Sequence, residues 1–372
     1  MSLPILSYAT AHADPPEFIR QLRHALLTTG FLYLDSIDAV VPDWRASWDA
    51  AFAASGDFFA HDEATKVEGI GMARSRHFRG YSAYGVEVTQ GRHDLREQID
   101  LGPDTEPAVE YPPLPPGTRI ERTLYGPNQY PSFVPSLEPA LRHWHRLCST
   151  ISHVVLALLA SSLTPHPARL TDLFSTRPGA EGEPAYSRMK VVRYPPVREG
   201  DDEEGGLGVG AHKDGGGLTL LAQDATGGLQ VQLWDGEWVG VEPREYALVV
   251  NVGQVVERFS AGLYAATTHR VLPTRSPTSR LSIPFFFCPR LDALVPILSP
   301  ADIHPALLDE AQRTPGAQSP EDKVSEVRKG DLHEEVFGLA AWRGITRSHG
   351  DVWARWYGRE VDPIGGPEVL AA

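Results

Sequence analysis

The second half of the chain is built from short apolar runs separated by glycine-containing turns. Residues 229–233 alternate strictly between apolar and polar side chains, Asp235-Gly236 supplies the residues of a tight turn, and residues 238–241 return as a second strand. Residues 246–252 and 281–287 are almost continuously apolar, which is typical of strands buried on both faces. Strands spaced in this way predict a β-sandwich or β-barrel rather than alternating β-α units.

Helical patterns flank this β region on both sides. Apolar residues at helical spacing predict helices over 16–28, 43–59, 137–163, 306–312 and 336–356. The fold class that we expect is therefore mainly β with flanking α. We expect three regions within one compact unit: an N-terminal module of strands and helices (1–185), a β core (186–295) and a C-terminal helical extension (296–372).

Composition narrows the functional classes. The chain has 34 Lys and Arg against 48 Asp and Glu, a net charge of −14, which disfavours binding to nucleic acids or to anionic membranes. The longest apolar run, residues 154–160, is far shorter than the roughly 20 residues that span a membrane. The first 15 residues lack a secretion signal pattern, and Cys148 and Cys288 have no zinc-type spacing. We expect a cytoplasmic protein with no obligate protein partner.

A candidate metal site lies inside the β region. His212-Lys213-Asp214 forms an HxD pair, and His269 follows 55 positions after Asp214. Side chains two residues apart on an extended strand point to the same side, so His212 and Asp214 can share one ion, which His269 must reach from another strand. Two imidazoles and one carboxylate with open positions are typical of non-haem Fe(II) oxygenases.

An apolar strand that carries an arginine follows His269. Arg280 and Ser282 project to one face of an apolar strand, and no Asp or Glu lies between Ala261 and Pro289. A buried guanidinium without a charged partner is costly, so we expect the partner to be a ligand. Arginine suits a carboxylate, because its planar N–H groups form two parallel hydrogen bonds.

Together these segments resemble the iron- and 2-oxoglutarate-dependent dioxygenases of the isopenicillin N synthase-like superfamily. The matching pieces, in order along the chain, are residues 3–6, 30–34, 78–82, 192–196, 208–214, 227–231, 250–253, 269–271 and 280–282. The resemblance implies a double-stranded β-helix (jelly-roll) core. It also implies that His212, Asp214 and His269 bind Fe(II).

The resemblance further implies that Arg280 and Ser282, with the hydroxyl of Tyr194, hold the distal carboxylate of 2-oxoglutarate. Two positions depart from the family pattern, because Gln254 stands where an Asp is common and Val192 where an Asn is common. Neither departure falls on a ligand position.

On the substrate side, the sequence is similar to the bacterial and fungal group that includes the ethylene-forming enzyme. That likeness places Glu87, Thr89, Lys190 and Arg347 on positions that bind substrate. Lys190 stands where that group has an arginine, which weakens a two-pronged grip on a substrate carboxylate, and His349 stands where that group has a tyrosine.

The expected activity is oxidation of a C–H bond in a small molecule, using O₂ and 2-oxoglutarate and releasing succinate and CO₂. Hydroxylation, desaturation and cyclisation remain open, as do the prime substrate and the oligomeric state. Three alternatives are an oxidase of the isopenicillin N synthase type that uses no 2-oxoglutarate, a zinc or manganese enzyme with non-oxidative chemistry, and a catalytically silent binding protein. The Arg280–Ser282 pair argues against the second, and the intact triad argues against the third.

Overall fold

The structure is a computed structural model that describes residues 2–89, 91–103, 120–175, 185–198, 201, 206–314 and 336–358. Its strands form a sheet of eight, a sheet of four and a two-stranded hairpin. The large sheet has the order β1 (Ile5–Ser7), β2 (Phe31–Asp35), β12 (Leu248–Val252), β9 (Leu218–Gln223), β14 (Arg280–Phe287), β7 (Ser187–Tyr194), β6 (Glu97–Leu101) and β3 (Gly80–Ser82). The small sheet has the order β11 (Trp238–Gly240), β10 (Leu229–Gln232), β13 (His269–Val271) and β8 (Val209–His212), and the hairpin pairs β4 (Val88–Thr89) with β5 (Arg92–His93).

One apolar core lies between the two sheets. Its buried members come from both, including Phe31, Val192 and Val249 of the large sheet and Val231 and Val271 of the small sheet. Neighbouring strands are antiparallel except for β1 and β2. Two facing antiparallel sheets around a shared core are the arrangement that the strand pattern predicts.

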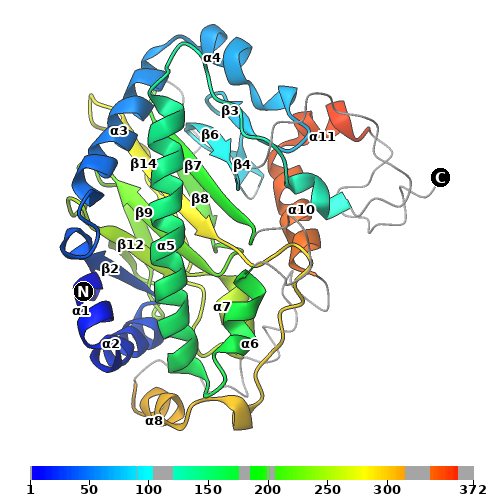
Figure 1. The fold of residues 1–372 in the computed structure, drawn as a ribbon. Helices are drawn as coiled ribbons and strands as arrows, with labels where there is room; N and C mark the ends of the chain where they lie inside the picture. The colour runs from blue at the N-terminus through cyan, green and yellow to red at the C-terminus, as the bar shows by residue number, and fades with distance from the viewer. Residues whose placement is uncertain are drawn as a thin grey trace.

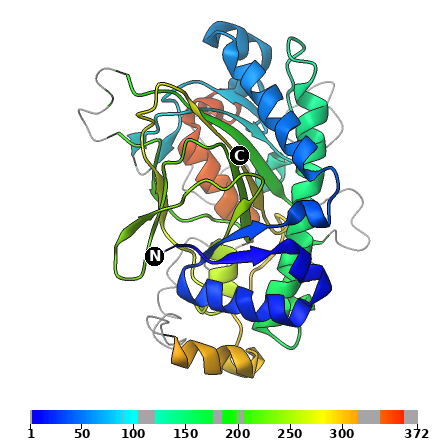
Figure 2. The ribbon, with the colours of Figure 1, turned by 90° about the vertical axis from the view of Figure 1, so that its left-hand side faces the viewer.

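A second and larger core lies between the outer face of the large sheet and the helices. The long helix α5 (Leu137–Leu163) runs beside α3 (Trp44–Ala60) across this face (Figures 1 and 2). Leu141, Trp144, Cys148, Ile151 and Val155 recur at helical spacing on the buried side of α5. By length and composition α5 is the one helix of the described residues that could cross a membrane, yet half of its most apolar stretch is buried inside the structure.

The remaining helices surround this framework. They are α1 (Tyr8–Ala13), α2 (Pro15–Thr28), α4 (Glu63–Ile70), α6 (Ala168–Thr171), α7 (Gln254–Phe259), α8 (Pro305–Arg313), α10 (Phe337–Ser348) and α11 (Gly350–Trp356), with the short 3₁₀ turns η1 (Ile37–Ala39), η2 (Met72–Arg74), η3 (Ile120–Leu124), η4 (Asp172–Phe174) and η5 (Pro300–Asp302). Figure 1 shows α10 and α11, in orange and red, at the end of the large sheet that carries β3 and β6, beside the hairpin strand β4.

Most of the predicted elements are present, and two differ in their bounds. The strand predicted over 246–252 begins only at Leu248, because Tyr246 adopts a left-handed backbone conformation with φ of 59°. The helix predicted over 336–356 is divided into α10 and α11 at His349, whose ψ of 63° is not helical. Two segments whose composition predicts loops, the proline-rich residues 103–116 and the charged residues 198–206, lie mostly outside the described residues.

The N-terminal region takes part directly in the large sheet. Leu32 of β2 lies opposite Val250 of β12, and Ile99 of β6 lies opposite Val191 of β7. The large sheet therefore contains strands from both sides of the expected boundary at residue 185. Strands from the N-terminal region extend both of its edges, β1 and β2 beside β12 and β6 and β3 beside β7.

Candidate functional site

Three side chains from separate parts of the chain meet between the sheets. His212 ends β8 and His269 begins β13, and the two are direct partners in the antiparallel ladder. Asp214 lies in the turn after β8, with Oδ1 at 3.7 Å from Nε2 of each histidine. One potential ligand atom from each residue lies within 4.8 Å of the others. The structure thus brings together the three residues predicted to bind the metal.

Backbone contacts orient both imidazole rings. Nδ1 of His212 lies 2.8 Å from the carbonyl oxygen of Gly210, and Nδ1 of His269 lies 3.1 Å from that of Thr267. A carbonyl only accepts, so in the neutral form of each ring Nδ1 carries the proton and the lone pair lies on Nε2. Metal-binding histidines are commonly held in this way through the ring nitrogen that does not bind the metal.

The carboxylate of Asp214 is held on one side only. Its Oδ2 accepts hydrogen bonds from the hydroxyl of Thr219 at 2.6 Å and from Nδ2 of Asn251 at 2.8 Å. Its Oδ1 faces the two histidines. Both supporting residues come from the large sheet, Thr219 from β9 and Asn251 from β12, so the large sheet positions a ligand that works with the small sheet's histidines.

Burial and the neighbouring groups together shift the pKa values of His212 and Asp214. Desolvation, together with the nearby His269, lowers the pKa of His212 to about 4, so its imidazole is neutral at neutral pH. Burial opposes the charge on Asp214, yet the two histidines and the two hydrogen bonds hold the pKa of Asp214 below its usual value. A neutral imidazole on His212 and a carboxylate on Asp214 are the forms that bind a divalent metal.

The predicted co-substrate residues form a second group in the same interior. Arg280 is 1% exposed, and its guanidinium donates to Oε1 of Gln223 at 2.8 Å and to Oγ of Ser282 at 3.2 Å. It lies 4.8 Å from the centre of the Tyr194 ring. Nε of Arg280 has no hydrogen-bond partner among the described residues, and neither Gln223 nor Ser282 is acidic. The buried cation therefore lacks the compensating charge that a carboxylate ligand would bring.

Of the four predicted substrate residues, three lie in or beside one buried polar cluster and the fourth is exposed. Lys190 and Glu87 are both buried, and Nζ of Lys190 donates to the two Glu87 oxygens at 2.7 and 2.9 Å. Thr89 lies on the adjacent hairpin, where its hydroxyl donates to Asp94 at 2.8 Å. Arg347 instead has an exposed side chain in the last turn of α10, and its Nε donates to the carbonyl of Arg343 in the same helix.

Several further buried polar residues near this site are not among the predicted site residues. Asp100 lies 3.7 Å from Lys190 and 2.8 Å from a nitrogen of Arg188, and Arg96 lies 3.0 Å from Glu87. His349 is buried 3.9 Å from Glu87, two positions beyond the predicted Arg347. The contacts of Asp100 join positions nearly 90 residues apart, and only the strand register brings them together.

Asp94 connects this polar cluster to the metal centre. One Asp94 oxygen accepts from the backbone N–H of Gly210 at 3.1 Å, and the other accepts from Arg96 at 2.9 Å. Gly210 is the residue whose carbonyl orients His212. The β4–β5 hairpin and the ion pair of Asp94 with Arg96 thus indirectly support His212, one of the predicted metal ligands.

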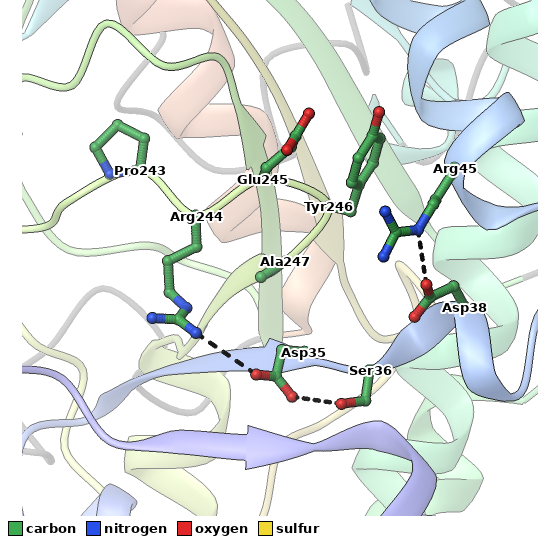
Figure 3. Close-up of a pocket in the computed structure, with 9 residues that line it drawn as sticks. All are labelled: Asp35, Ser36, Asp38, Arg45, Pro243, Arg244, Glu245, Tyr246 and Ala247. Atoms are coloured by element: carbon green, nitrogen blue, oxygen red, sulfur yellow. Dashed lines mark hydrogen bonds and ion pairs between the residues drawn. The ribbon is translucent and has the colours of Figure 1, made fainter.

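A separate surface pocket of about 430 Å³ contains none of the predicted site residues. Figure 3 shows each of its two arginines paired with an acid, Arg45 with Asp38 at 2.7 Å and Arg244 with Asp35 at 3.7 Å. These exposed pairs offset both arginines of the pocket, and the interior cluster remains the candidate site.

Comparison with known proteins agrees with this geometry. Residues 186–289 match the 2OG-Fe(II) oxygenase superfamily, and residues 3–133 match the N-terminal region described as non-haem dioxygenase in morphine synthesis. A 2-oxoglutarate-dependent dioxygenase, frbJ, of Dothideomycetidae sp. (strain 11243) is 33% identical over 374 residues, covering all of this chain and 94% of the relative. A 2-oxoglutarate-dependent dioxygenase of Gibberella zeae is 34% identical over 300 residues, covering 77% of this chain and 74% of the relative.

Solved structures show the same fold. A 2OG-Fe(II) oxygenase family protein from Caulobacter crescentus is 26% identical with a TM-score of 0.63, covering 84% of this chain and 99% of that one. A full-length Neurospora crassa protein in complex with alpha-KG is 22% identical with a TM-score of 0.62, covering 86% of this chain and 90% of that one. The predicted jelly-roll core is thereby confirmed, and so is its mainly β class with flanking helices. The chain belongs to the 2-oxoglutarate- and Fe(II)-dependent oxygenases of the isopenicillin N synthase-like superfamily.

Proposed function

We propose that His212, Asp214 and His269 hold the Fe(II) of this oxygenase, and that Arg280 with Ser282 and Tyr194 binds the distal carboxylate of 2-oxoglutarate. The observation that carries the assignment is the fully buried Arg280, whose hydrogen-bond partners Gln223 and Ser282 are both neutral and whose Nε is unpaired among the described residues. It lies in the same interior as the three converging ligands.

The donor set fits a ferrous ion. The second polar atom of each ligand is already engaged, Nδ1 of both histidines with carbonyl oxygens and Oδ2 of Asp214 with Thr219 and Asn251. The three remaining donor atoms face one point, and such a triad leaves other coordination positions free for small ligands. When bound, iron with O₂ and 2-oxoglutarate supplies the oxidising power needed to cleave an unactivated C–H bond.

The chain's own residues orient and shield these groups. Hydrogen bonds to Ser282 and Gln223 hold the guanidinium of Arg280 in one orientation, so that its N–H donors are in position before 2-oxoglutarate binds. The ring of Phe31 packs edge-on against His269 with centroids 5.3 Å apart, which places an apolar wall beside the ligand and keeps water from one side.

On the substrate side, the proposal keeps Glu87, Thr89 and Lys190 as lining residues. Burial of Glu87 and Lys190 supports this assignment, as does the close approach of the Thr89 side chain to Gly210, which places the hairpin over β8. Arg347 stays a prediction, because its described contact is with its own helix. The likeness to the ethylene-forming group also stays a prediction, and the oxidation outcome remains open.

The expected setting is the cytoplasm, with a small molecule as substrate. Cys148 and Cys288 are free, buried thiols, which supports a reducing compartment. The net charge of −14 supports the proposal that nucleic acids and anionic membranes are not partners.

The test is release of succinate from 2-oxoglutarate under air with added Fe(II), with Fe(II)-dependent binding of 2-oxoglutarate measured without O₂. Wild type should bind 2-oxoglutarate and release succinate, His212→Ala should lose both, and Arg280→Ala should lose 2-oxoglutarate affinity while it keeps the metal. Arg313→Ala, an exposed change in α8, is the matched control and should behave as wild type. Oxygen consumption by wild type without any 2-oxoglutarate would overturn the proposal in favour of the oxidase alternative.

A further inference from the structure

The inner face of the large sheet carries a second arginine near the metal ligands. In an antiparallel ladder, directly opposite residues project to the same face. Arg188 of β7 lies opposite Phe286 of β14, and Phe286 lies opposite Thr219 of β9. Thr219 donates its hydroxyl to Asp214. Arg188 therefore faces the same interior as Thr219 from two strands away, a backbone separation of roughly 10 Å.

This arginine is only partly satisfied by its protein partner. One nitrogen of its guanidinium donates to Oδ1 of Asp100 at 2.8 Å, and its Nε has no hydrogen-bond partner among the described residues. Asp100 is shared, because it also accepts from Gln98 at 2.6 Å and lies 3.7 Å from Lys190. A guanidinium has five donors, so most of those on Arg188 are still available.

Accessibility separates Arg188 from the two other cations of the cluster. The side chain of Arg188 is 21% exposed, whereas those of Arg96 and Lys190 are 9% and 8% exposed. Arg96 contacts both Glu87 and Asp94, and Lys190 contacts both oxygens of Glu87. Of these three cations, Arg188 is the one with both solvent access and unused donors.

Arg188 is also remote from the arginine assigned to 2-oxoglutarate. Arg280 lies opposite Tyr194 at one end of the β7–β14 ladder, and Arg188 lies opposite Phe286 near the other end. The step along β14 from Arg280 to Phe286 separates the two positions by roughly 20 Å of strand. One small dicarboxylic acid cannot serve both arginines and also reach the metal ligands. The second cation therefore has a different ligand.

We propose that Arg188 binds a carboxylate of the molecule that is oxidised, which makes the substrate a small organic acid. The inference rests on the proposed function and names the substrate class of that same site. Arginine matches a carboxylate in shape and charge. A substrate carboxylate would take the place of the water molecules at the exposed part of Arg188, next to the buried Asp100–Lys190 pair. The acid anchors one end of the substrate while the rest extends toward His212, Asp214 and His269.

The experiment uses pairs of compounds that differ only in this group. The common L-amino acids and a series of aryl and alkyl carboxylic acids are each tested beside their primary amides, with Fe(II) and 2-oxoglutarate present. The readouts are binding of each compound without O₂ and stimulation of succinate release under air. Wild type should bind at least one acid and be stimulated by it, and the matching amide should bind roughly tenfold more weakly or worse.

Two variants locate the effect at Arg188. Arg188→Lys keeps the charge but loses the planar fork, so acid affinity should fall roughly tenfold, and Arg188→Met should abolish measurable acid binding. Both variants should keep the wild-type affinity for Fe(II) and 2-oxoglutarate, which also shows that they are folded. Arg313→Met, which removes an exposed arginine of α8, should leave acid binding unchanged.

Three results would overturn the inference: no acid in the series binds to wild type, the amides bind as well as the acids, or Arg188→Lys and Arg188→Met bind the acid as well as wild type. A different result, wild type failing to bind 2-oxoglutarate with Fe(II), would overturn the proposed function itself. The two failures are therefore distinguishable in the same set of measurements.

Discussion

Changing Thr219 to valine removes one hydroxyl group from the support of Asp214 and leaves the size of the side chain nearly unchanged. The hydroxyl is buried and donates to Oδ2 of Asp214 at 2.6 Å. Asn251 supplies the other hydrogen bond to the same oxygen, so the carboxylate would keep one of its two supports. We expect Thr219→Val to weaken Fe(II) binding without removing a ligand.

The expected magnitude follows from two independent considerations. A hydrogen bond to a charged group contributes about 1.5–3 kcal/mol. Loss of a residue that orients a metal ligand typically lowers metal affinity about 10–100-fold, which corresponds to about 1.4–2.8 kcal/mol. The two ranges agree, so the Fe(II) dissociation constant of Thr219→Val should rise about 10–100-fold.

The assay is competition for Fe(II) against a chelator of known affinity, without O₂, together with urea denaturation of the metal-free protein. Thr346→Val is the matched control, because the hydroxyl of Thr346 is also buried but donates to the neutral carbonyl of Trp342 in α10. It should lose some stability, about 1 kcal/mol, and keep its Fe(II) affinity. Unchanged Fe(II) affinity in Thr219→Val, or an equal loss in both variants, would refute the assignment of Asp214 as a supported ligand.

Three further changes test other parts of the structure. Gly253→Ala should lower Fe(II) affinity and stability, because the new Cβ would lie 2.8 Å from the backbone oxygen of Asp214, and chelator competition measures this effect. Lys66→Met should destabilise the fold by about 3 kcal/mol in urea denaturation, since it leaves the buried Glu97 with fewer compensating partners. Burial, together with a nearby arginine, lowers the pKa of His145 from 6.5 to about 4, so the unfolded chain binds a proton at higher pH than the folded one. The stability that neutral His145 contributes should therefore be lost as pH falls from about 6.5 to about 4, and His145→Gln should flatten that part of the stability profile.

The elements with strong local patterns could be predicted from the sequence. Helix α5 occupies the predicted residues 137–163, and the hairpin of β10 and β11 turns at Asp235-Gly236 as expected. The three residues predicted to bind the metal could be named as a cluster, because the HxD spacing of His212 and Asp214 is local and the neighbouring motifs identify His269. Most of these features depend on residues close together in the chain, whereas His269 lies 55 positions after Asp214.

The rest of the site depends on strand register, which no local pattern specifies. Lys190 and Asp100 are 90 positions apart and become neighbours only because β6 pairs with β7 in one particular alignment. The same holds for Asn251, which reaches Asp214 from β12. One predicted substrate residue, Arg347, is exposed instead of buried. The chain breaks between α10 and α11 at His349, and it is His349 whose side chain is buried there.

The pairing of β2 with β12 and of β6 with β7 has a consequence for protein engineering. A fragment limited to residues 186–289 would contain the three predicted metal ligands and Arg280, but it would leave one side of β12 and one side of β7 as open edges. Unpaired edges of this kind invite strand exchange and aggregation. To change the specificity of this protein, loops should therefore be exchanged within the intact chain, and the fragment 186–289 should not be used on its own.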